Sequence, residues 1–260
     1  MSANLKYQLN KDLVIGLGEI GNPILKVISK SISAAGFDID QKLMKKNQYD
    51  SLLNQKTIFV HVCIPFSEKF VKSVLEIVKQ HNPAAIVIHS TISPGTTEII
   101  QKKLSIPVIY SATRGIHKRM AKDLHRYTKF YSVYEWATNS KWASKQYEKR
   151  MRNAGIKTKK MSTPLTLEIA KIVVDTSYYG WLITYAQLSN MIAIKNKLNY
   201  DEMWSFADEI HKFLGNRPKM FPGFIGGHCV IPNLDLIKND TLNLIKQINN
   251  DYAKILKSKK

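Results

Sequence analysis

The sequence contains few cysteines and no long apolar run. Cys63 and Cys229 are the only cysteines among 260 residues, which is too few for a disulfide framework. No run of roughly 18 apolar residues occurs, so we expect no transmembrane helix and no membrane partner. The N-terminal residues lack the apolar segment of a secretory signal. A reducing, cytoplasmic setting is therefore expected.

Acidic residues are also scarce. The chain has 20 Asp and Glu against 39 Lys and Arg, so its formal net charge is +19. The excess gathers in residues 113–129 and 141–160, and it favours an anionic partner. Because no recognised nucleic-acid-binding module accompanies the charge, we expect an anionic small molecule and no nucleic acid. The apolar share of 44% excludes wholesale disorder.

The first part of the chain alternates short apolar strands with amphipathic helices. Near-continuous apolar strands separated by helices are typical of a parallel sheet that is covered on both faces. The pattern therefore predicts an α/β fold with a doubly wound parallel sheet. The predicted strands are residues 12–16, 35–39, 57–64, 84–89, 106–110, 129–135 and 156–161.

The character of the sequence changes after residue 162. Thr163-Pro164 is a good helix start, and residues 165–196 read as one long, mostly apolar helix. Further helices are predicted at 200–214 and 234–256, with a loop rich in Pro and Gly at 216–232. We therefore expect two domains, 1–162 and an all-helical domain 163–260. The long apolar helix argues for a homodimer.

A glycine motif follows the first predicted strand and opens the first helix. In Gly16-Leu-Gly18-Glu-Ile-Gly21 the first glycine permits a tight turn, the second allows a pyrophosphate to approach, and the third allows close helix packing. Asp38, at the end of the second strand, can accept hydrogen bonds from both ribose hydroxyls and repels a 2′-phosphate. The motif predicts a Rossmann-like domain that binds NAD. The alternative is a glycine turn with a purely structural role.

Three charged residues share one stripe of the long predicted helix. Glu168, Lys171 and Asp175 are spaced by three and four residues, among apolar neighbours. Such groups must pair with one another or face a polar cavity, since burying an isolated charge is costly. Either a catalytic cluster or a surface salt-bridge stripe fits this spacing.

The third candidate is the segment Gly226-Gly227-His228-Cys229. A cysteine in a glycine-rich turn at a helix start can have a lowered pKa and an open approach, as a nucleophilic thiolate requires. The alternative is an inert small apolar residue, which we expect Cys63 to be. No second ligand at a helical spacing accompanies His228, so no metal site is expected.

Together these pieces resemble the UDP-glucose/UDP-N-acetylmannosamine/GDP-mannose dehydrogenase family. The matching segments are Gly16 to Gly21, Asp38, Ser90-Thr-Ile-Ser-Pro-Gly-Thr-Thr97, Glu168-Ile-Ala-Lys171 and Gly226-Gly-His-Cys229. The last segment looks most like the UDP-N-acetylmannosamine branch. Members of this family oxidise the alcohol of a nucleotide sugar to a carboxylate while two NAD molecules are reduced.

The resemblance implies roles for particular residues. Cys229 would attack the intermediate aldehyde to give a thiohemiacetal and then a thioester, and Lys171 would stabilise the oxyanion. Thr91 would lie near the nicotinamide and help to place water, and Glu168 matches the family's acid. The implied NAD-binding residues are Gly16, Gly18, Glu19, Ile20, Gly21, Asp38, Pro65, Ser90 and Thr91. The implied substrate-binding residues are Arg114, Lys118, Gly226, Gly227 and His228.

The chain departs from the family at several places. It ends where the family's C-terminal nucleotide-binding domain begins, so we expect that domain to be lacking. Asp175 stands where a carboxyamide is expected, and residues 112–118 replace an acidic segment. Two other interpretations therefore stay open: a two-electron β-hydroxyacid-type dehydrogenase that uses Lys171, and a non-catalytic NAD-binding or scaffold protein.

Overall fold

The computed structural model describes residues 10–227 and 229–258. The chain divides into two compact units, the first ending at Ile169 and the second beginning at Ala170. The division falls later than residue 162 because the start of helix α7 (Pro164–Ala170) belongs to the first unit. There Leu167 joins the apolar core against the sheet.

The first unit is built on a seven-stranded sheet with the order β2-β1-β3-β4-β5-β6-β7. The strands from β1 to β5 run parallel, which confirms a doubly wound sheet. The expectation of a wholly parallel sheet is wrong at one place, since β6 runs antiparallel to β5 and pairs Ile109 with Val133. The strands are β1 Asn10–Ile15, β2 Ala34–Phe37, β3 Lys56–Val62, β4 Ala85–Ile88, β5 Val108–Tyr110, β6 Lys129–Val133 and β7 Thr158–Lys160.

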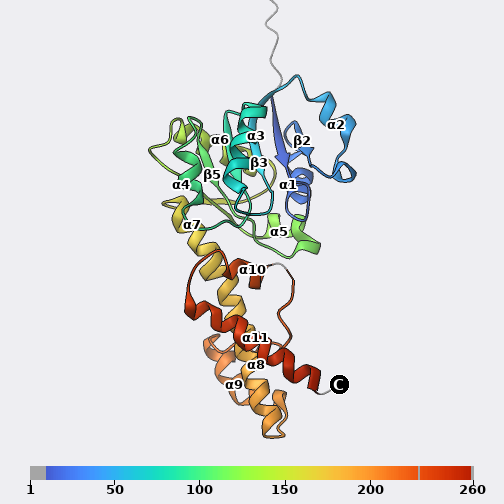
Figure 1. Cartoon of the computed structure of the whole chain (residues 1–260), viewed down its shortest axis with the longest axis vertical. Helices are drawn as coiled ribbons and strands as arrows, with labels where there is room; N and C mark the ends of the chain where they lie inside the picture. Colours follow the sequence, from blue (N-terminus) through green and yellow to red (C-terminus); the bar gives the residue numbers. More distant parts are fainter. Residues whose placement is uncertain (1–9, 228, 259–260) are drawn as a thin grey trace, which may run out of the picture. The chain divides into compact units, whose positions relative to one another are not determined.

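The strands are buried on both faces, as their continuous apolar sequences predict. Val14 of β1 points into a core beneath α1, α5 and α6, whereas Leu13 and Ile15 point into a second core beneath α3 and α4. Figure 1 shows helices covering the sheet in this way. The helices of this unit are α1 Gly21–Ile28, α2 Lys46–Ser51, α3 Phe70–His81, α4 Thr96–Gln101, α5 Met120–Arg126 and α6 Ser140–Asn153, with 3-10 turns η1 Gln41–Leu43 and η2 His117–Arg119.

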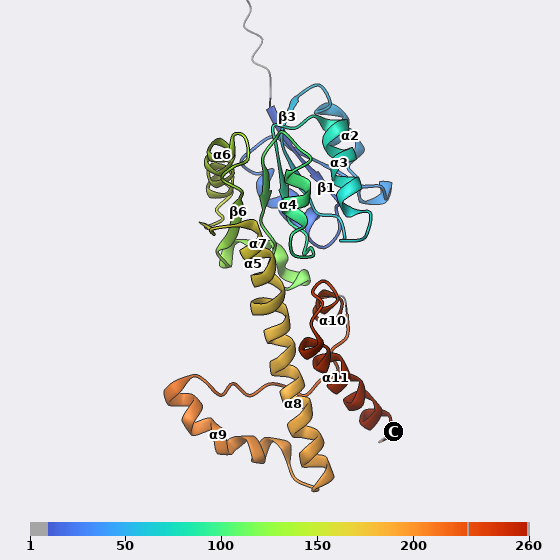
Figure 2. The same ribbon diagram turned by 60° about the vertical axis from the view of Figure 1, so that its left-hand side comes forward.

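The second unit is helical. Its first element is a π-helix, η3 (Lys171–Ser177), which α8 (Tyr178–Lys195) continues without a break. The predicted long helix therefore exists, but its first turns are wound more widely than an α-helix. α9 (Tyr200–Leu214) and α11 (Asp240–Ser258) both contact α8. Figure 2 shows α11 beside α8. Among the described residues, no helix is long and apolar enough to cross a membrane.

The short helix α10 (Val230–Leu234) completes the core of the second unit. Val230, Leu234 and Ile245 are buried together with Ile225 from the preceding loop. Gly180 of α8 makes this packing possible, because a Cβ there would lie 2.9 Å from Val230 Cγ1. α10 also packs against η3. The loop after α9 is thus tied to the start of the long helix.

Candidate functional site

The glycine turn between β1 and α1 has the geometry that its sequence predicts. Gly16 has a φ of 87°, which favours glycine, and a Cβ at Gly21 would lie 1.7 Å from the Gly16 carbonyl oxygen. These two glycines therefore bring the helix close against the turn. Gly18 differs, because a Cβ there would meet no atom within 4 Å. Its backbone faces open space, as a turn that admits a pyrophosphate requires.

Asp38 follows β2 directly and fastens its end to the same turn. One carboxylate oxygen accepts a hydrogen bond from Leu17 N at 2.5 Å, and the other accepts one from Asp40 N at 2.9 Å. Asp38 is only half-buried, and a carboxylate oxygen can accept more than one hydrogen bond. The side chain can therefore still accept from a ribose hydroxyl. Gly18 and Asp38 together fit the adenosine and pyrophosphate parts of NAD.

The turn is also contacted from the loop that follows β5. His117 Nδ1 lies 2.6 Å from Glu19 Oε2, so an imidazole stands beside the one carboxylate of the turn. Ile20, the next residue, packs partly against the apolar core. Glu19 thus links the turn to His117 on the surface, and Ile20 links it to the apolar core.

The remaining predicted cofactor residues follow the ends of neighbouring strands. Pro65 comes after β3, and Ser90 and Thr91 come after β4. Ser90 Oγ donates to the Ile64 carbonyl oxygen at 2.5 Å, which links the two loops. Since carboxyl ends of parallel strands share one sheet edge, these residues lie along the same edge as the glycine turn and Asp38. In doubly wound folds ligands bind at this edge.

Glu168 of α7 is fully buried, and both of its carboxylate oxygens accept hydrogen bonds. Oε2 accepts from Gly95 N at 2.6 Å, and Oε1 accepts from Thr97 N at 2.9 Å and Thr97 Oγ1 at 2.6 Å. Burial raises the pKa of Glu168, and the bonds from Thr97 and Gly95 oppose that rise. The arrangement anchors residues 95–97 to α7. The catalytic role that the resemblance implies for Glu168 stays a prediction.

Lys171 and Asp175 form an ion pair on the π-helix of the second unit. Their side chains are 2.6 Å apart, and the Lys171 side chain is only 11% exposed. The carboxylate at position 175 therefore accompanies the ammonium group and offsets part of its charge. π-Helical turns often occur at functional sites. Glu168, which the sequence places on the same stripe, is bonded elsewhere.

Cys229 lies directly before α10 and is exposed. The glycines before it include Gly227 with a φ of 77° and the exposed Gly226. Because α10 packs against the π-helix, the segments that carry Cys229 and Lys171 are brought together within the second unit. The predicted substrate residue His228 lies outside the described residues.

The second cysteine has a different environment. Burial raises the pKa of the Cys63 thiol to about 12, while the positive charge of Lys129 opposes the rise. A thiol with such a pKa holds its proton at neutral pH and does not act as a nucleophile. Of the two cysteines, Cys229 is therefore the candidate for covalent chemistry.

Part of the predicted anion-binding run is engaged within its own segment. Arg114 donates to the Thr128 carbonyl oxygen at 2.8 Å and lies over the Phe130 ring at 4.9 Å. Its guanidinium thus ties the start of the segment between β5 and β6 to the residues at the start of β6, as well as carrying charge. Lys118 is exposed on the 3-10 turn η2.

Solved structures show which proteins share this fold, although no known protein family and no curated protein matches the sequence. The UDP-D-ManNAc dehydrogenase of Pyrococcus horikoshii aligns with a TM-score of 0.75 at 18% identity, over 94% of this chain and 69% of that one. Cap5O of Staphylococcus aureus, a UDP-N-acetyl-mannosamine dehydrogenase, aligns with a TM-score of 0.72 at 18% sequence identity. The alignment covers 95% of this chain and 69% of Cap5O. The 3-hydroxyisobutyrate dehydrogenase of Mycobacterium tuberculosis aligns with a TM-score of 0.65 at 14% sequence identity. The alignment covers 95% of this chain and 94% of that dehydrogenase. The chain has their fold.

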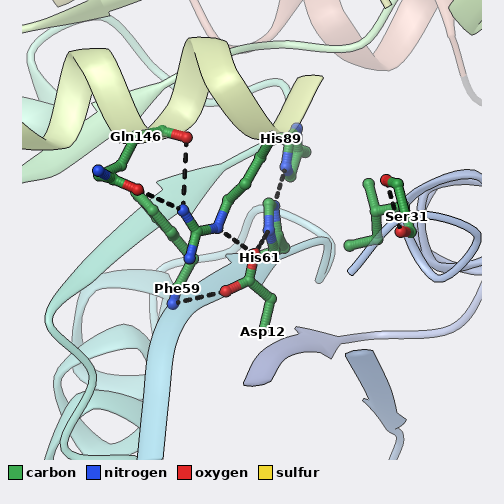
Figure 3. A network of polar contacts seen from close by, with 8 residues as sticks. Asp12, Ser31, Phe59, His61, His89 and Gln146 are labelled. Atoms are coloured by element: carbon green, nitrogen blue, oxygen red, sulfur yellow. Dashed lines mark hydrogen bonds and ion pairs between the residues drawn. The ribbon is translucent and has the colours of Figure 1, made fainter. Parts of the chain in front are cut away.

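A buried network of polar side chains, which the sequence did not lead us to expect, lies beneath α6. Asp12 accepts from Phe59 N at 3.2 Å and from Arg150 Nε at 2.8 Å, and His61 Nε2 lies 3.6 Å from its carboxylate (Figure 3). His61 Nδ1 in turn lies 2.9 Å from His89 Nε2. A signal for it was present, since His61 interrupts the apolar run of β3, while Asp12 and His89 border the apolar runs of β1 and β4.

The contact at the His89 end places one hydrogen on Nδ1 of each imidazole. His89 Nδ1 faces the Ser111 carbonyl oxygen at 3.1 Å, so it must carry a hydrogen. His89 Nε2 then accepts from His61 Nδ1. Burial, and then the charges of Lys129 and His61, hold the pKa of His89 well below its usual value, against the effect of the Ser111 bond. His89 is therefore neutral at pH 7.

The described part of the chain contains no group of three His, Cys, Asp or Glu residues that could hold a metal ion.

Proposed function

We propose that the chain is an NAD-dependent dehydrogenase that oxidises an alcohol or aldehyde group of an anionic, sugar-nucleotide-like substrate. The observation that carries this proposal is the exposed thiol of Cys229 on a segment packed against the π-helix of Lys171. The glycine turn and Asp38 supply the features that suit the cofactor. The fold shared with two UDP-N-acetylmannosamine dehydrogenases supports the same substrate class.

In this proposal the side chains of the two units have separate tasks. Gly18 and Asp38 bind the cofactor, which when bound supplies the acceptor for the electron pair that leaves the substrate carbon. Cys229 Sγ adds to the aldehyde carbon as a thiolate, forming a carbon–sulfur bond and an oxyanion. Lys171 Nζ stabilises that oxyanion, while Asp175 holds the ammonium group in place. The thiohemiacetal carbon would then give up its hydride to the acceptor that the bound cofactor supplies, leaving a thioester, and water would hydrolyse the thioester to the carboxylate and the free Cys229 thiol.

The test is Cys229→Ser with NADH counted per substrate consumed. The wild-type chain should form about two NADH and a carboxylic acid from a suitable nucleotide sugar, as the covalent route requires. The variant should still bind NAD, because its cofactor residues lie in the other unit, but should form no acid. Unchanged acid formation in the variant would rule out the covalent mechanism.

The alternative enzyme is a two-electron dehydrogenase for a β-hydroxyacid. One observation favours it: the 3-hydroxyisobutyrate dehydrogenase is matched over 94% of its own length. In that case Lys171 is the general acid–base group and Cys229 is dispensable. One NADH per substrate and a carbonyl product, with full activity in Cys229→Ser, would select this function. NAD binding without any turnover would select a non-catalytic role.

We further propose that the second unit forms a homodimer. Large apolar side chains that lie exposed on α8 and α9 would be covered by a second copy of the chain. These residues are Tyr178, Tyr179, Tyr185, Leu188, Ile192, Phe206, Phe213 and Leu214. Phe206→Asp should shift the mass measured by light scattering from dimer to monomer. Ile39→Asp, at an equally exposed position of the first unit, is the control and should leave the mass unchanged.

A further inference from the structure

Two buried amides join the helices of the second unit to the loop that carries Cys229. Gln187 of α8 is fully buried, and Asn249 of α11 is 3% exposed. Gln187 Nε2 donates to Asn249 Oδ1 at 2.9 Å, so the two amides form a bridge between α8 and α11. Most buried polar side-chain atoms in proteins are hydrogen-bonded, so the partners of these two amides indicate their role.

The partners of this bridge are backbone groups of the loop. Asn249 Oδ1 accepts from Ile225 N at 2.8 Å, and Asn249 Nδ2 donates to the Ile225 carbonyl oxygen at 3.1 Å. Gln187 Nε2 also donates to the Gly223 carbonyl oxygen at 2.7 Å. Asn249 thus holds both polar groups of one loop residue, as a neighbouring β-strand would.

These contacts fix the loop on the side that precedes Cys229. Ile225 is buried, and only Gly226, Gly227 and residue 228 separate it from the thiol. On the other side Val230 is buried against Gly180 of α8. Because Cys229 lies only four residues after Ile225 and directly before Val230, its position depends on how both of these residues are held.

We infer that Asn249 and Gln187 are positioning residues for Cys229, which hold the loop at 223–225 so that the thiol meets the substrate. The inference rests on the proposed function for its catalytic part. The hydrogen bonds themselves can be tested without any substrate.

The same pair of helices provides a matched control. Asn190 Nδ2 donates to Tyr252 Oη at 2.9 Å, three residues further along both α8 and α11. This bond joins side chains of the same two helices, whereas the bonds of Asn249 reach the backbone of Ile225. Asn249→Leu and Asn190→Leu therefore each remove a polar bridge between α8 and α11, but only the first releases the loop.

The experiment compares the two variants with the wild-type full-length chain. In Asn249→Leu, amide hydrogen exchange in the peptide that covers residues 221–227 should accelerate by about tenfold or more, as expected for lost hydrogen bonds. The alkylation rate of Cys229 by iodoacetamide should change in the same variant. Asn190→Leu should alter neither. Equal exchange and alkylation in all three proteins would overturn the inference.

Activity supplies the second measurement. If the wild-type chain turns over a nucleotide sugar, Asn249→Leu should lower kcat at least about tenfold and leave the Kd of NAD unchanged. A normal kcat in Asn249→Leu would refute the positioning role even though the proposed function stands. Absence of turnover in the wild-type chain would refute the proposed function, while exchange and alkylation still decide on the loop. If Asn249→Leu does not fold, Gln187→Met removes the Gly223 bond and tests the same prediction.

Discussion

The pair formed by Asp12 and Arg150 gives a sharp prediction about the stability of the first unit. Both side chains are largely buried, with exposed fractions of 2% and 14%, and their charged atoms are 2.8 Å apart. Asp12→Leu removes the carboxylate and leaves the guanidinium beneath α6. It also removes the acceptor of Phe59 N.

The expected loss of unfolding free energy depends on which buried charge is left without its partner. Breaking a buried ion pair from one side costs about 3–5 kcal/mol in unfolding free energy. Arg150 keeps a bond to Gln146 Oε1 at 3.0 Å and lies over the Phe59 ring at 4.7 Å, so the lower end of this range applies. We expect Asp12→Leu to cost about 3 kcal/mol. Arg150→Met should cost a similar amount, because it leaves the buried Asp12 carboxylate with its hydrogen bond from Phe59 N but without the guanidinium that balances its charge.

The double variant separates charge burial from packing. Replacing both members of a buried ion pair by apolar side chains of similar size is often nearly neutral. Asp12→Leu combined with Arg150→Met should therefore cost at least about 2 kcal/mol less than the sum of the single variants; some cost remains because Phe59 N still loses its acceptor. Urea unfolding at pH 7, followed by circular dichroism and linear extrapolation, measures all three. Two results would refute this account. One is a loss of unfolding free energy below about 1 kcal/mol in each single variant. The other is a loss in the double variant that equals the sum of the two single losses.

Three shorter predictions follow from other contacts. First, His89 stays neutral in the folded chain and takes up a proton in the unfolded chain near pH 6.5, so stability should fall as the pH drops below that value. Below pH 6.5 the free energy of unfolding should fall by about 1.4 kcal/mol per pH unit more in the wild type than in His89→Gln. Urea titrations at several pH values measure both slopes, and equal slopes would contradict the prediction. Second, Gly21→Ala should abolish NAD binding in a calorimetric titration or prevent folding, because its Cβ would overlap the Gly16 carbonyl oxygen. Third, a disulfide reagent at pH 8 should label one thiol rapidly in the folded chain and none in Cys229→Ser, since burial raises the pKa of Cys63 to about 12; rapid labelling of two thiols would disprove the assignment.

Much of the first unit could be predicted from local sequence. Runs of apolar residues of strand length, each followed by a helical period, are sufficient to indicate a doubly wound sheet, because such strands must be covered on both faces. The glycine turn could be predicted for a similar reason, since Gly16 and Gly21 occupy positions that no side chain fits. The reversed direction of β6 could not be predicted, because an apolar strand reads the same in either direction.

The candidate site was less predictable than the fold. The spacing of Glu168, Lys171 and Asp175 indicates one stripe, but spacing cannot say which partner each charge takes. In the structure, Lys171 pairs with Asp175, while Glu168 binds the backbone of Gly95 and Thr97 from a distant segment. The π-helix that carries the pair has no signal in the apolar pattern.

Residue order along the chain thus determined where strands, turns and helices form, since burial repeats with the period of each element. Contacts between distant residues were decided only by tertiary structure. Asp12 meets Arg150 across 138 positions, and Gln187 meets Asn249 across 62. A buried charge or amide must be satisfied by whatever group the packing brings near it, and no local pattern specifies that group.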